Sequence, residues 1–199
     1  MTYSRASPSP HYERMIKLYQ TMHTQGEKQL GLMPDETYPG IYALRHAVHI
    51  KELIDESGAR TLLDYGSGKG YQYDLPKVTI PGAGEWDSLI DYWDVDEVRC
   101  FDPCYAPFSK FPEGNFDGVI STDVLEHCTA EDIPWIVTEM FSLARLFVFV
   151  TVACYPAKST LPNGENAHTT IRPAEWWKTI FANAASIYSG VHWKLLVEK

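Results

Sequence analysis

The sequence predicts an α/β protein in which a mostly parallel sheet carries helices on both faces. From residue 58 onward, short apolar runs alternate with amphipathic segments, as strands and helices do in such sheets. The run at 146–153 is almost continuously apolar, which is typical of a strand buried on both faces. A glycine-rich segment directly follows the first apolar run, where open α/β sheets place their ligands.

Composition limits the classes of partner. The 199 residues suit one domain, and 17 basic residues against 26 acidic ones give a net charge of −9. A nucleic-acid partner is not expected, because binding phosphates requires clustered Lys and Arg. The N-terminus has no apolar core of signal-peptide length, and no apolar run is long enough to cross a bilayer, so we expect a cytoplasmic protein without a membrane partner.

The N-terminal quarter is expected to be helical. Residues 1–10 are interpreted as a flexible arm, and 12–30 as a helix with apolar residues at helical spacing. A second helix is predicted over 41–57, with Gly58 as its stop. Together, residues 11–57 would form a helical cap that lies across the carboxyl edge of the sheet and roofs the site, with 58–199 as the α/β core.

The core elements follow in order. Pro76 and Pro81 allow only a short helix after the glycine segment. Residues 187–197 are expected to form a strand or hairpin. The other predictions are strands over 60–64, 97–101, 116–121 and 146–153, and helices over 85–93, 131–143 and 173–184, the last with Pro173 in its first turn.

The segment Asp64-Tyr65-Gly66-Ser67-Gly68-Lys69-Gly70 is the centre of the expected site. A phosphate-binding P-loop is excluded, because position 63 is Leu and position 70 is Gly. The spacing G-x-G-x-G also disfavours a dinucleotide site, which uses G-x-G-x-x-G. Alternating glycines let a backbone approach a ligand closely, and Asp64 would suit a cationic one.

The pattern Asp64-x-Gly66-x-Gly68-x-Gly70 resembles the first motif of the class I S-adenosylmethionine-dependent methyltransferase family. The string from Phe116 to His127, with its Leu-Glu-His, is similar to the fourth-strand segment of that family. The resemblance implies a Rossmann-like fold and S-adenosyl-L-methionine as cofactor. Asp102, which closes the second strand, matches the acid that binds the ribose hydroxyls in the family.

The resemblance implies cofactor contacts at Asp64, Tyr65, Gly66, Ser67, Gly68, Gly70, Asp102, Pro103 and Asp123. Asp102 and Phe116 are only 14 positions apart, so the third strand is expected to be missing or reduced to a loop at 105–112. Glu126 and His127 are expected to begin or cap the following helix, with a catalytic role as the alternative.

The acceptor side is expected after the buried strand. An oxygen or amine acceptor needs a base, and His168 is the first candidate, followed by Glu165 and Tyr155. These residues lie in or beside a loop that leaves the carboxyl end of a central strand. His46 and His49 share a helix face and could line the roof or bind a metal, but we expect no metal site.

The leading hypothesis is in-line methyl transfer from S-adenosyl-L-methionine to a small polar molecule. Two alternatives remain at this stage. The chain could be a regulatory module that binds S-adenosylmethionine or a nucleoside without catalysis, a hypothesis motivated by the irregular central region. It could also be a nicotinamide-dependent oxidoreductase. The sequence leaves the acceptor and the oligomeric state open.

Overall fold

Five parallel strands form the central sheet of the computed structural model, which describes residues 3–199. The strand order is β4-β1-β5-β6-β7, and every neighbouring pair is parallel. This confirms the predicted α/β class with a parallel sheet. The strands are β1 (Thr61–Tyr65), β4 (Glu97–Phe101), β5 (Phe116–Thr122), β6 (Ala144–Ala153) and β7 (His192–Glu198).

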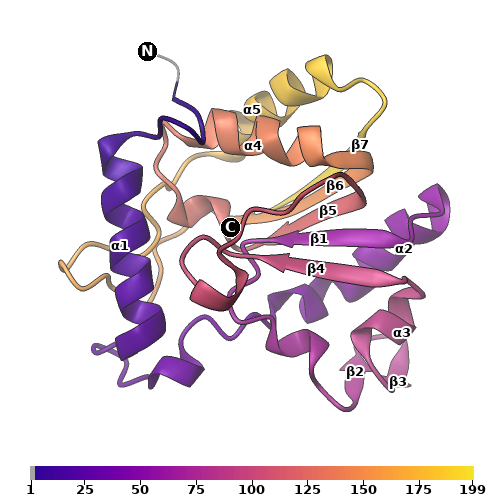
Figure 1. Ribbon diagram of the computed structural model, residues 1–199, viewed down its shortest axis with the longest axis horizontal. Helices are drawn as coiled ribbons and strands as arrows, with labels where there is room; N and C mark the ends of the chain where they lie inside the picture. Colours follow the sequence, from indigo (N-terminus) through magenta and orange to yellow (C-terminus); the bar gives the residue numbers. More distant parts are fainter. Residues whose placement is uncertain (1–2) are drawn as a thin grey trace.

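Helices cover both faces of the sheet (Figure 1). One face carries α2 (Ala47–Ser57) and α3 (Leu89–Trp93), and the other carries α4 (Ile133–Leu143) and α5 (Ala174–Ile187). Successive strand residues alternate between the two layers, as the pleat requires. Leu62, Ile120 and Phe149 pack with α2, whereas Leu63, Val119 and Val148 pack with α4 and α5.

The central region is short of regular structure, as its prolines predict. Residues 71–73 form one 3-10 turn, and β2 (Val78–Ile80) pairs with β3 (Gly84–Trp86) in a separate hairpin. The helix predicted over 85–93 is therefore too long, because its first residues belong to β3. Among the described residues, β4 pairs only with β1, and 105–112 holds just the 3-10 turn Ala106–Phe108. The expected loss of the third strand is confirmed.

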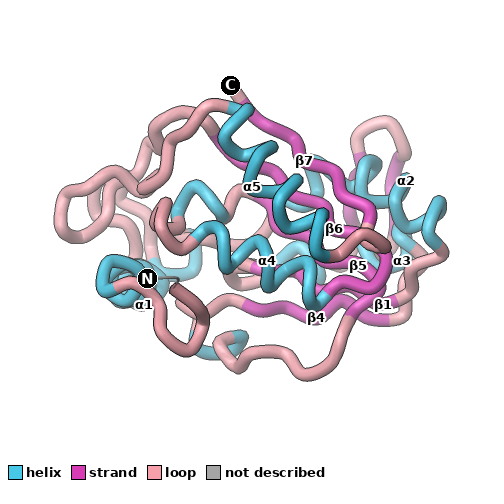
Figure 2. Tube along the Cα trace, turned by 90° about the horizontal axis from the view of Figure 1, so that it is seen from above, coloured by secondary structure: helices cyan, strands magenta, loops and turns pink. Residues whose placement is uncertain are grey.

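The first helix ends earlier than its apolar pattern predicts. Helix α1 spans Pro10–Gln25, and Gly26 follows it with a φ of +81°. A Cβ at Gly26 would lie 2.1 Å from the Leu32 carbonyl oxygen, because the chain turns back on itself there. Figures 1 and 2 show α1 standing apart from the sheet, beside the end toward which β1 and β4 point.

The second predicted helix is divided. Its first part, Tyr42–His46, is a 3-10 turn, and the α-helical part α2 begins at Ala47. Ala47, Ile50 and Ile54 are buried against the sheet face with Ile120 and Phe149. Helix α2 thus covers a face of the sheet, and only α1 and the segment before α2 reach the expected roof. Gly58 ends α2 in the left-handed conformation, as predicted.

The N-terminal arm is anchored, which corrects the expectation of a flexible arm for its described residues. Arg5 donates hydrogen bonds to Glu139 and to the Tyr65 hydroxyl. Ser9 is 1% exposed and donates from both its backbone N–H and its hydroxyl to Asp132. Residues 3–9 therefore connect α1 to α4. Within residues 3–199, none of the helices has the length and apolar character that a bilayer span requires.

Candidate functional site

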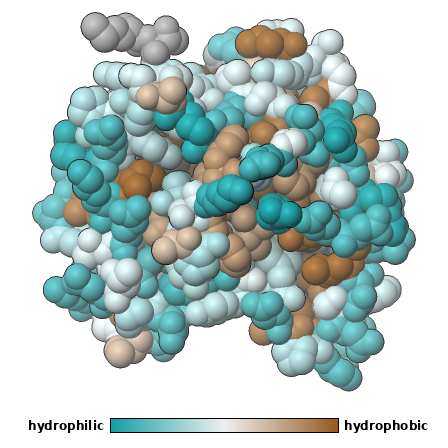
Figure 3. Space-filling view, in the orientation of Figure 1, coloured by the Kyte–Doolittle hydropathy of each residue, from teal (hydrophilic) through white to brown (hydrophobic). Residues whose placement is uncertain are grey.

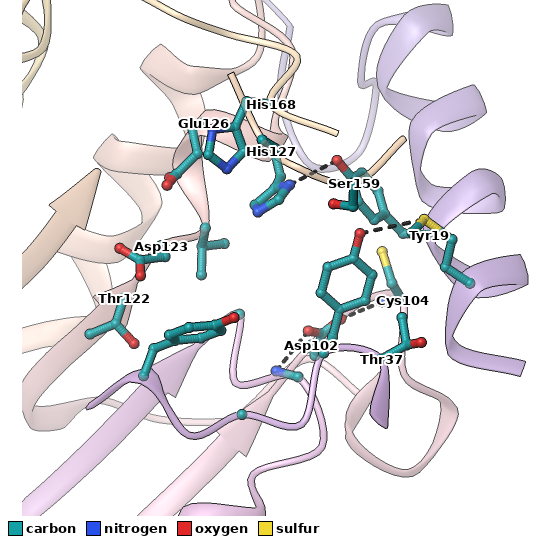
Figure 4. A pocket seen from close by; sticks show the side chains of 18 of the residues that line it. Tyr19, Thr37, Asp102, Cys104, Thr122, Asp123, Glu126, His127, Ser159 and His168 are labelled. Carbon is teal, nitrogen blue, oxygen red and sulfur yellow. Dashed lines mark hydrogen bonds between the residues drawn. The ribbon is translucent and has the colours of Figure 1, made fainter. Parts of the chain in front are cut away.

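A cavity of about 510 Å³ opens at the carboxyl ends of β1, β5 and β6. Its walls come from α1, from segments 36–45, 64–68, 102–104 and 122–128, and from the chain after β6. Figure 4 shows the side chains of Asp102, Asp123, His127 and Tyr19 around its open centre. This volume falls within the range of small-molecule sites, roughly 300–1,000 Å³.

The glycine loop after β1 has a backbone that favours glycine. Gly66 and Gly68 have φ values of +84° and +57°. A Cβ at Gly68 would lie 2.6 Å from the Tyr38 carbonyl oxygen, and one at Gly66 would lie 2.4 Å from a methyl carbon of Val124. The sequence suggested that these glycines admit a ligand. The structure shows that close packing inside the protein already requires them.

Residues 37–40, which we call the strap, hold the loop in place. The backbone N–H groups of Lys69, Tyr71 and Gln72 donate to the carbonyl oxygens of Tyr38, Pro39 and Gly40, at 3.0, 3.0 and 3.1 Å. The Lys69 ammonium donates to the Thr37 carbonyl oxygen and is only 4% exposed. The loop and the strap are thus hydrogen-bonded into one wall, a pairing that no sequence pattern signalled.

Asp102 lies at the end of β4, directly beside the glycine loop. The Gly68 N–H donates to its Oδ2 at 2.9 Å, and the Cys104 N–H donates to its Oδ1 at 2.7 Å. Burial raises the pKa of Asp102 to about 6, although these backbone bonds favour the charged form. A carboxylate oxygen has two lone pairs, so each oxygen keeps one for a further donor from the cavity.

Asp64 also lines the cavity but is engaged by the protein itself. Its Oδ2 accepts from the Tyr73 hydroxyl at 2.8 Å and from the Gln72 amide at 3.1 Å. Burial raises its pKa to about 7, since the carboxyl group is 1% exposed. A cation nearby would favour the charged form of this carboxyl group.

The other expected cofactor residues divide into two groups. Tyr65, Ser67 and Pro103 line the cavity, but the Tyr65 hydroxyl donates to Glu139 at 2.7 Å, in the direction of α4. Gly70 does not reach the cavity, because it packs against Cys100 and the strap. The structure therefore brings eight of the nine expected positions to one cavity: Asp64, Tyr65, Gly66, Ser67, Gly68, Asp102, Pro103 and Asp123.

Asp123 lies just beyond β5 with a φ of +56°, which is uncommon for a residue with a side chain. Its Oδ1 accepts a hydrogen bond from the Thr151 hydroxyl at 2.7 Å, and its N–H points to the same residue. The neighbouring strand β6 thus fixes the carboxylate at the cavity wall. Strained backbone of this kind often occurs at functional sites.

His168 reaches the cavity wall from the loop after β6. Its Nδ1 lies 2.5 Å from the carbonyl oxygen of Tyr155, and a carbonyl oxygen only accepts, so Nδ1 carries the proton. Nε2 is then left with a free lone pair. The structure thus supplies the tautomer that a base needs.

The two secondary candidates for a base have other environments. Tyr155 lines the cavity, but its hydroxyl donates to Glu198 at 3.0 Å, and this bond raises the pKa of Tyr155. Glu165 is exposed on the loop and does not line the cavity. Of the three candidates, His168 is therefore the one that lines the cavity with an unprotonated ring nitrogen.

Glu126, His127 and Tyr19 are cavity residues that the site prediction left out. Glu126 and His127 belong to the 3-10 turn Leu125–His127, and Asp132 is the residue that precedes α4, so they neither begin nor cap that helix. The Tyr19 hydroxyl and His127 Nδ1 meet at the Ala167 carbonyl oxygen, at 2.6 and 2.9 Å. Burial lowers the pKa of His127 to about 3, so it stays neutral.

Only the helical spacing of α1 offered a signal for Tyr19, and that spacing does not tell which apolar face meets a cavity.

Comparisons with protein-family models, with curated proteins and with solved structures found no match for this chain. The interpretation of the site therefore depends on its own residues.

Proposed function

We propose that this chain is an S-adenosyl-L-methionine-dependent methyltransferase with a Rossmann-like sheet, acting on a small polar molecule. The observation that carries the proposal is the arrangement of Asp102. Its two oxygens are oriented by backbone N–H groups of the glycine loop and of its own turn, and they border the cavity. One carboxylate that keeps a free lone pair on each oxygen suits the two hydroxyls of a ribose.

The remaining walls fit the other parts of the cofactor. Asp64 lies at the end of the neighbouring strand and suits a cationic group. Gly66, Ser67 and Gly68 also line the cavity, and Figure 4 shows Asp123 across its open centre from Asp102. When bound, S-adenosyl-L-methionine would supply a methyl group that its sulfonium already activates.

The protein's own contribution is positioning and proton removal. Holding an acceptor in line can lower the barrier by about 7–11 kcal/mol. His168, with Nδ1 bonded to the Tyr155 carbonyl oxygen, would accept the acceptor's proton at Nε2 and add roughly 10²–10⁴-fold. The four cysteines are free thiols, which agrees with the proposed cytoplasmic location.

The test is calorimetric titration of the whole chain with S-adenosylmethionine, S-adenosylhomocysteine and NAD. We expect binding of both adenosyl ligands and none of NAD. Asp102→Ala should abolish this binding, because the ribose hydroxyls lose their acceptor. Asp87→Ala removes an exposed aspartate away from the cavity and should bind normally.

Circular dichroism of each variant establishes that it is folded. No affinity of the wild-type chain for either adenosyl ligand would refute the proposal, and so would normal binding by a folded Asp102→Ala variant. Binding without formation of S-adenosylhomocysteine, across a panel of acceptors, would favour the non-catalytic module. Asp102 is a better position to test than Gly66, where a side chain would collide with Val124.

A further inference from the structure

Three side chains with metal-ligating atoms meet beside the cavity. His46 ends the 3-10 turn before α2, Asp123 follows β5, and Glu198 ends β7. One ligand atom from each of the three lies within 4.8 Å of the others. The three residues are far apart in sequence, so the fold alone brings them together.

The two carboxylates of this cluster lack a basic partner. Across residues 3–199, no Lys or Arg nitrogen lies within 4.0 Å of either Asp123 or Glu198, and the one ion-pair contact is His46 Nε2 to Glu198 Oε1 at 3.8 Å. Each carboxylate accepts one hydroxyl hydrogen bond, from Thr151 and Tyr155 respectively. Two carboxylates with oxygens within 4.8 Å of each other repel, so a cation bound between them would be favourable.

The third member offers an unpaired nitrogen. His46 Nε2 is buried, and it has no hydrogen-bond partner among the described residues. Its side chain is 11% exposed and packs near the ring of Phe149. An imidazole nitrogen without a hydrogen-bond partner is available to bind a metal.

We propose that His46, Asp123 and Glu198 bind one divalent first-row transition-metal ion, of which Zn²⁺ and Mn²⁺ are the best probes. Two carboxylates balance the charge of a dication. One imidazole favours such ions over Mg²⁺ and Ca²⁺, which prefer all-oxygen sites. Bonds of about 2.0–2.2 Å require the ligand atoms to lie closer together than 4.8 Å, a distance that small side-chain rotations cover.

The ion would lie at the cavity wall. Asp123 lines the cavity, and so does Tyr155, whose hydroxyl contacts Glu198. Three protein ligands leave at least one coordination position for another group. Where the proposed function holds, this position would take an oxygen of the methyl acceptor, so the acceptor class would be molecules with an anionic or hydroxyl oxygen. The metal site itself does not depend on that function.

The test is titration of the metal-free whole chain with Zn²⁺, Mn²⁺ and Mg²⁺, followed by calorimetry and, for Mn²⁺, by electron paramagnetic resonance. We expect one Zn²⁺ or Mn²⁺ per chain and much weaker Mg²⁺ binding. His46→Ala and Glu198→Gln should each weaken Zn²⁺ and Mn²⁺ binding about tenfold or more. His49→Ala is the matched control, because His49 is exposed on α2, pairs with Glu52 and should leave binding unchanged.

If neither Zn²⁺ nor Mn²⁺ binds at one ion per chain, the proposed metal site is overturned. Unchanged binding in both His46→Ala and Glu198→Gln would also overturn it, because the ion would then bind elsewhere, for example at cysteines. Glu198→Gln keeps the size of a partly exposed side chain, so its folding is not at risk. Titration of the same samples with S-adenosylmethionine separates the two proposals. If the chain binds the metal but does not bind S-adenosylmethionine, only the methyltransferase proposal is contradicted.

Discussion

At the scale of single residues, the notable feature is that three carboxyl groups lining the cavity are buried. Asp64, Asp102 and Glu126 are at most 8% exposed, and burial raises the pKa of each. The first two end neighbouring parallel strands, so their proximity could be predicted from sequence. Their internal donors, Gln72 and Tyr73 for Asp64 and Cys104 for Asp102, follow from the course of the loops.

Glu126 gives a prediction for the pH dependence of stability. Its side chain is completely buried, Oε1 accepts from the Ala153 N–H, and Oε2 has no partner among residues 3–199. Burial raises its pKa from 4.5 to about 8. Because the folded chain binds this proton more tightly than the unfolded chain, the group's stabilisation is complete below about pH 4.5 and is lost as the pH rises toward 8.

We therefore expect Glu126→Gln to lose less stability than the wild type between about pH 5 and pH 8, by roughly 2–4 kcal/mol. Urea denaturation at several pH values measures this difference in the free energy of unfolding. Glu85→Gln changes an exposed glutamate and should follow the wild type. Parallel pH profiles for wild type and Glu126→Gln would show that the group titrates normally.

At the scale of elements, local patterns predicted strands better than helix ends. The strand over 97–101 has the predicted bounds, because its apolar run stops at the Asp-Pro turn. The helix predicted over 12–30 was too long at its C-terminal end, because the apolar spacing continues past Gly26 into a segment where the backbone reverses direction. The placement of α1 over the carboxyl ends depends on contacts with distant residues, such as Tyr19 with Ala167, which spacing does not encode.

The start of α1 gives a second prediction. The Ser9 hydroxyl caps the helix by accepting from the Tyr12 N–H, and it also donates to Asp132, so that it connects α1 to the start of α4. Ser9→Ala should lower the free energy of unfolding by about 1–2 kcal/mol. For a chain of this size, this corresponds to about 2–4 °C in melting temperature per kcal/mol.

Thermal unfolding followed by circular dichroism measures this effect. The control is Ser7→Ala, because Ser7 is exposed and, within residues 3–199, only its backbone makes hydrogen bonds. Equal melting temperatures for the two variants would mean that the Ser9 cap contributes little.

At the scale of the whole molecule, the site lies between the sheet and a helix that precedes it in the chain. The sequence predicted the parallel sheet, and eight of the nine expected site positions line one cavity because they follow the order of the strands. It did not predict the strap or the grouping of His46, Asp123 and Glu198, which assemble from distant segments. Figure 3 shows a face with many hydrophilic side chains and a group of hydrophobic ones near its centre.

Arg5 in the N-terminal arm contacts α4, the end of β1 and the loop that contains Phe111. Its guanidinium donates to Glu139 on α4 and to Tyr65 at the end of β1, and it lies over the ring of Phe111. Arg5→Ala should lower the free energy of unfolding by about 1.5–3 kcal/mol, the range for hydrogen bonds to charged groups. Arg5→Lys should recover only part of this, since an ammonium lacks the planar fork.

Urea denaturation of both variants tests this prediction, with Arg14→Ala at an exposed position of α1 as the control. If Arg5→Ala unfolds like Arg14→Ala, the Arg5 contacts with Glu139 and Tyr65 contribute nothing to stability.

The contact between the strap and the glycine loop also bears on what glycine spacing signifies. Since Gly68 is required by the Tyr38 carbonyl oxygen, and Gly66 by Val124, substitutions there would damage folding before they affected any ligand. A chain whose cavity took no ligand would need the same two glycines for as long as it kept the strap. The glycine spacing is therefore a signature of the architecture in this corner of the molecule, and the proposed function has to be tested at the acidic residues beside it.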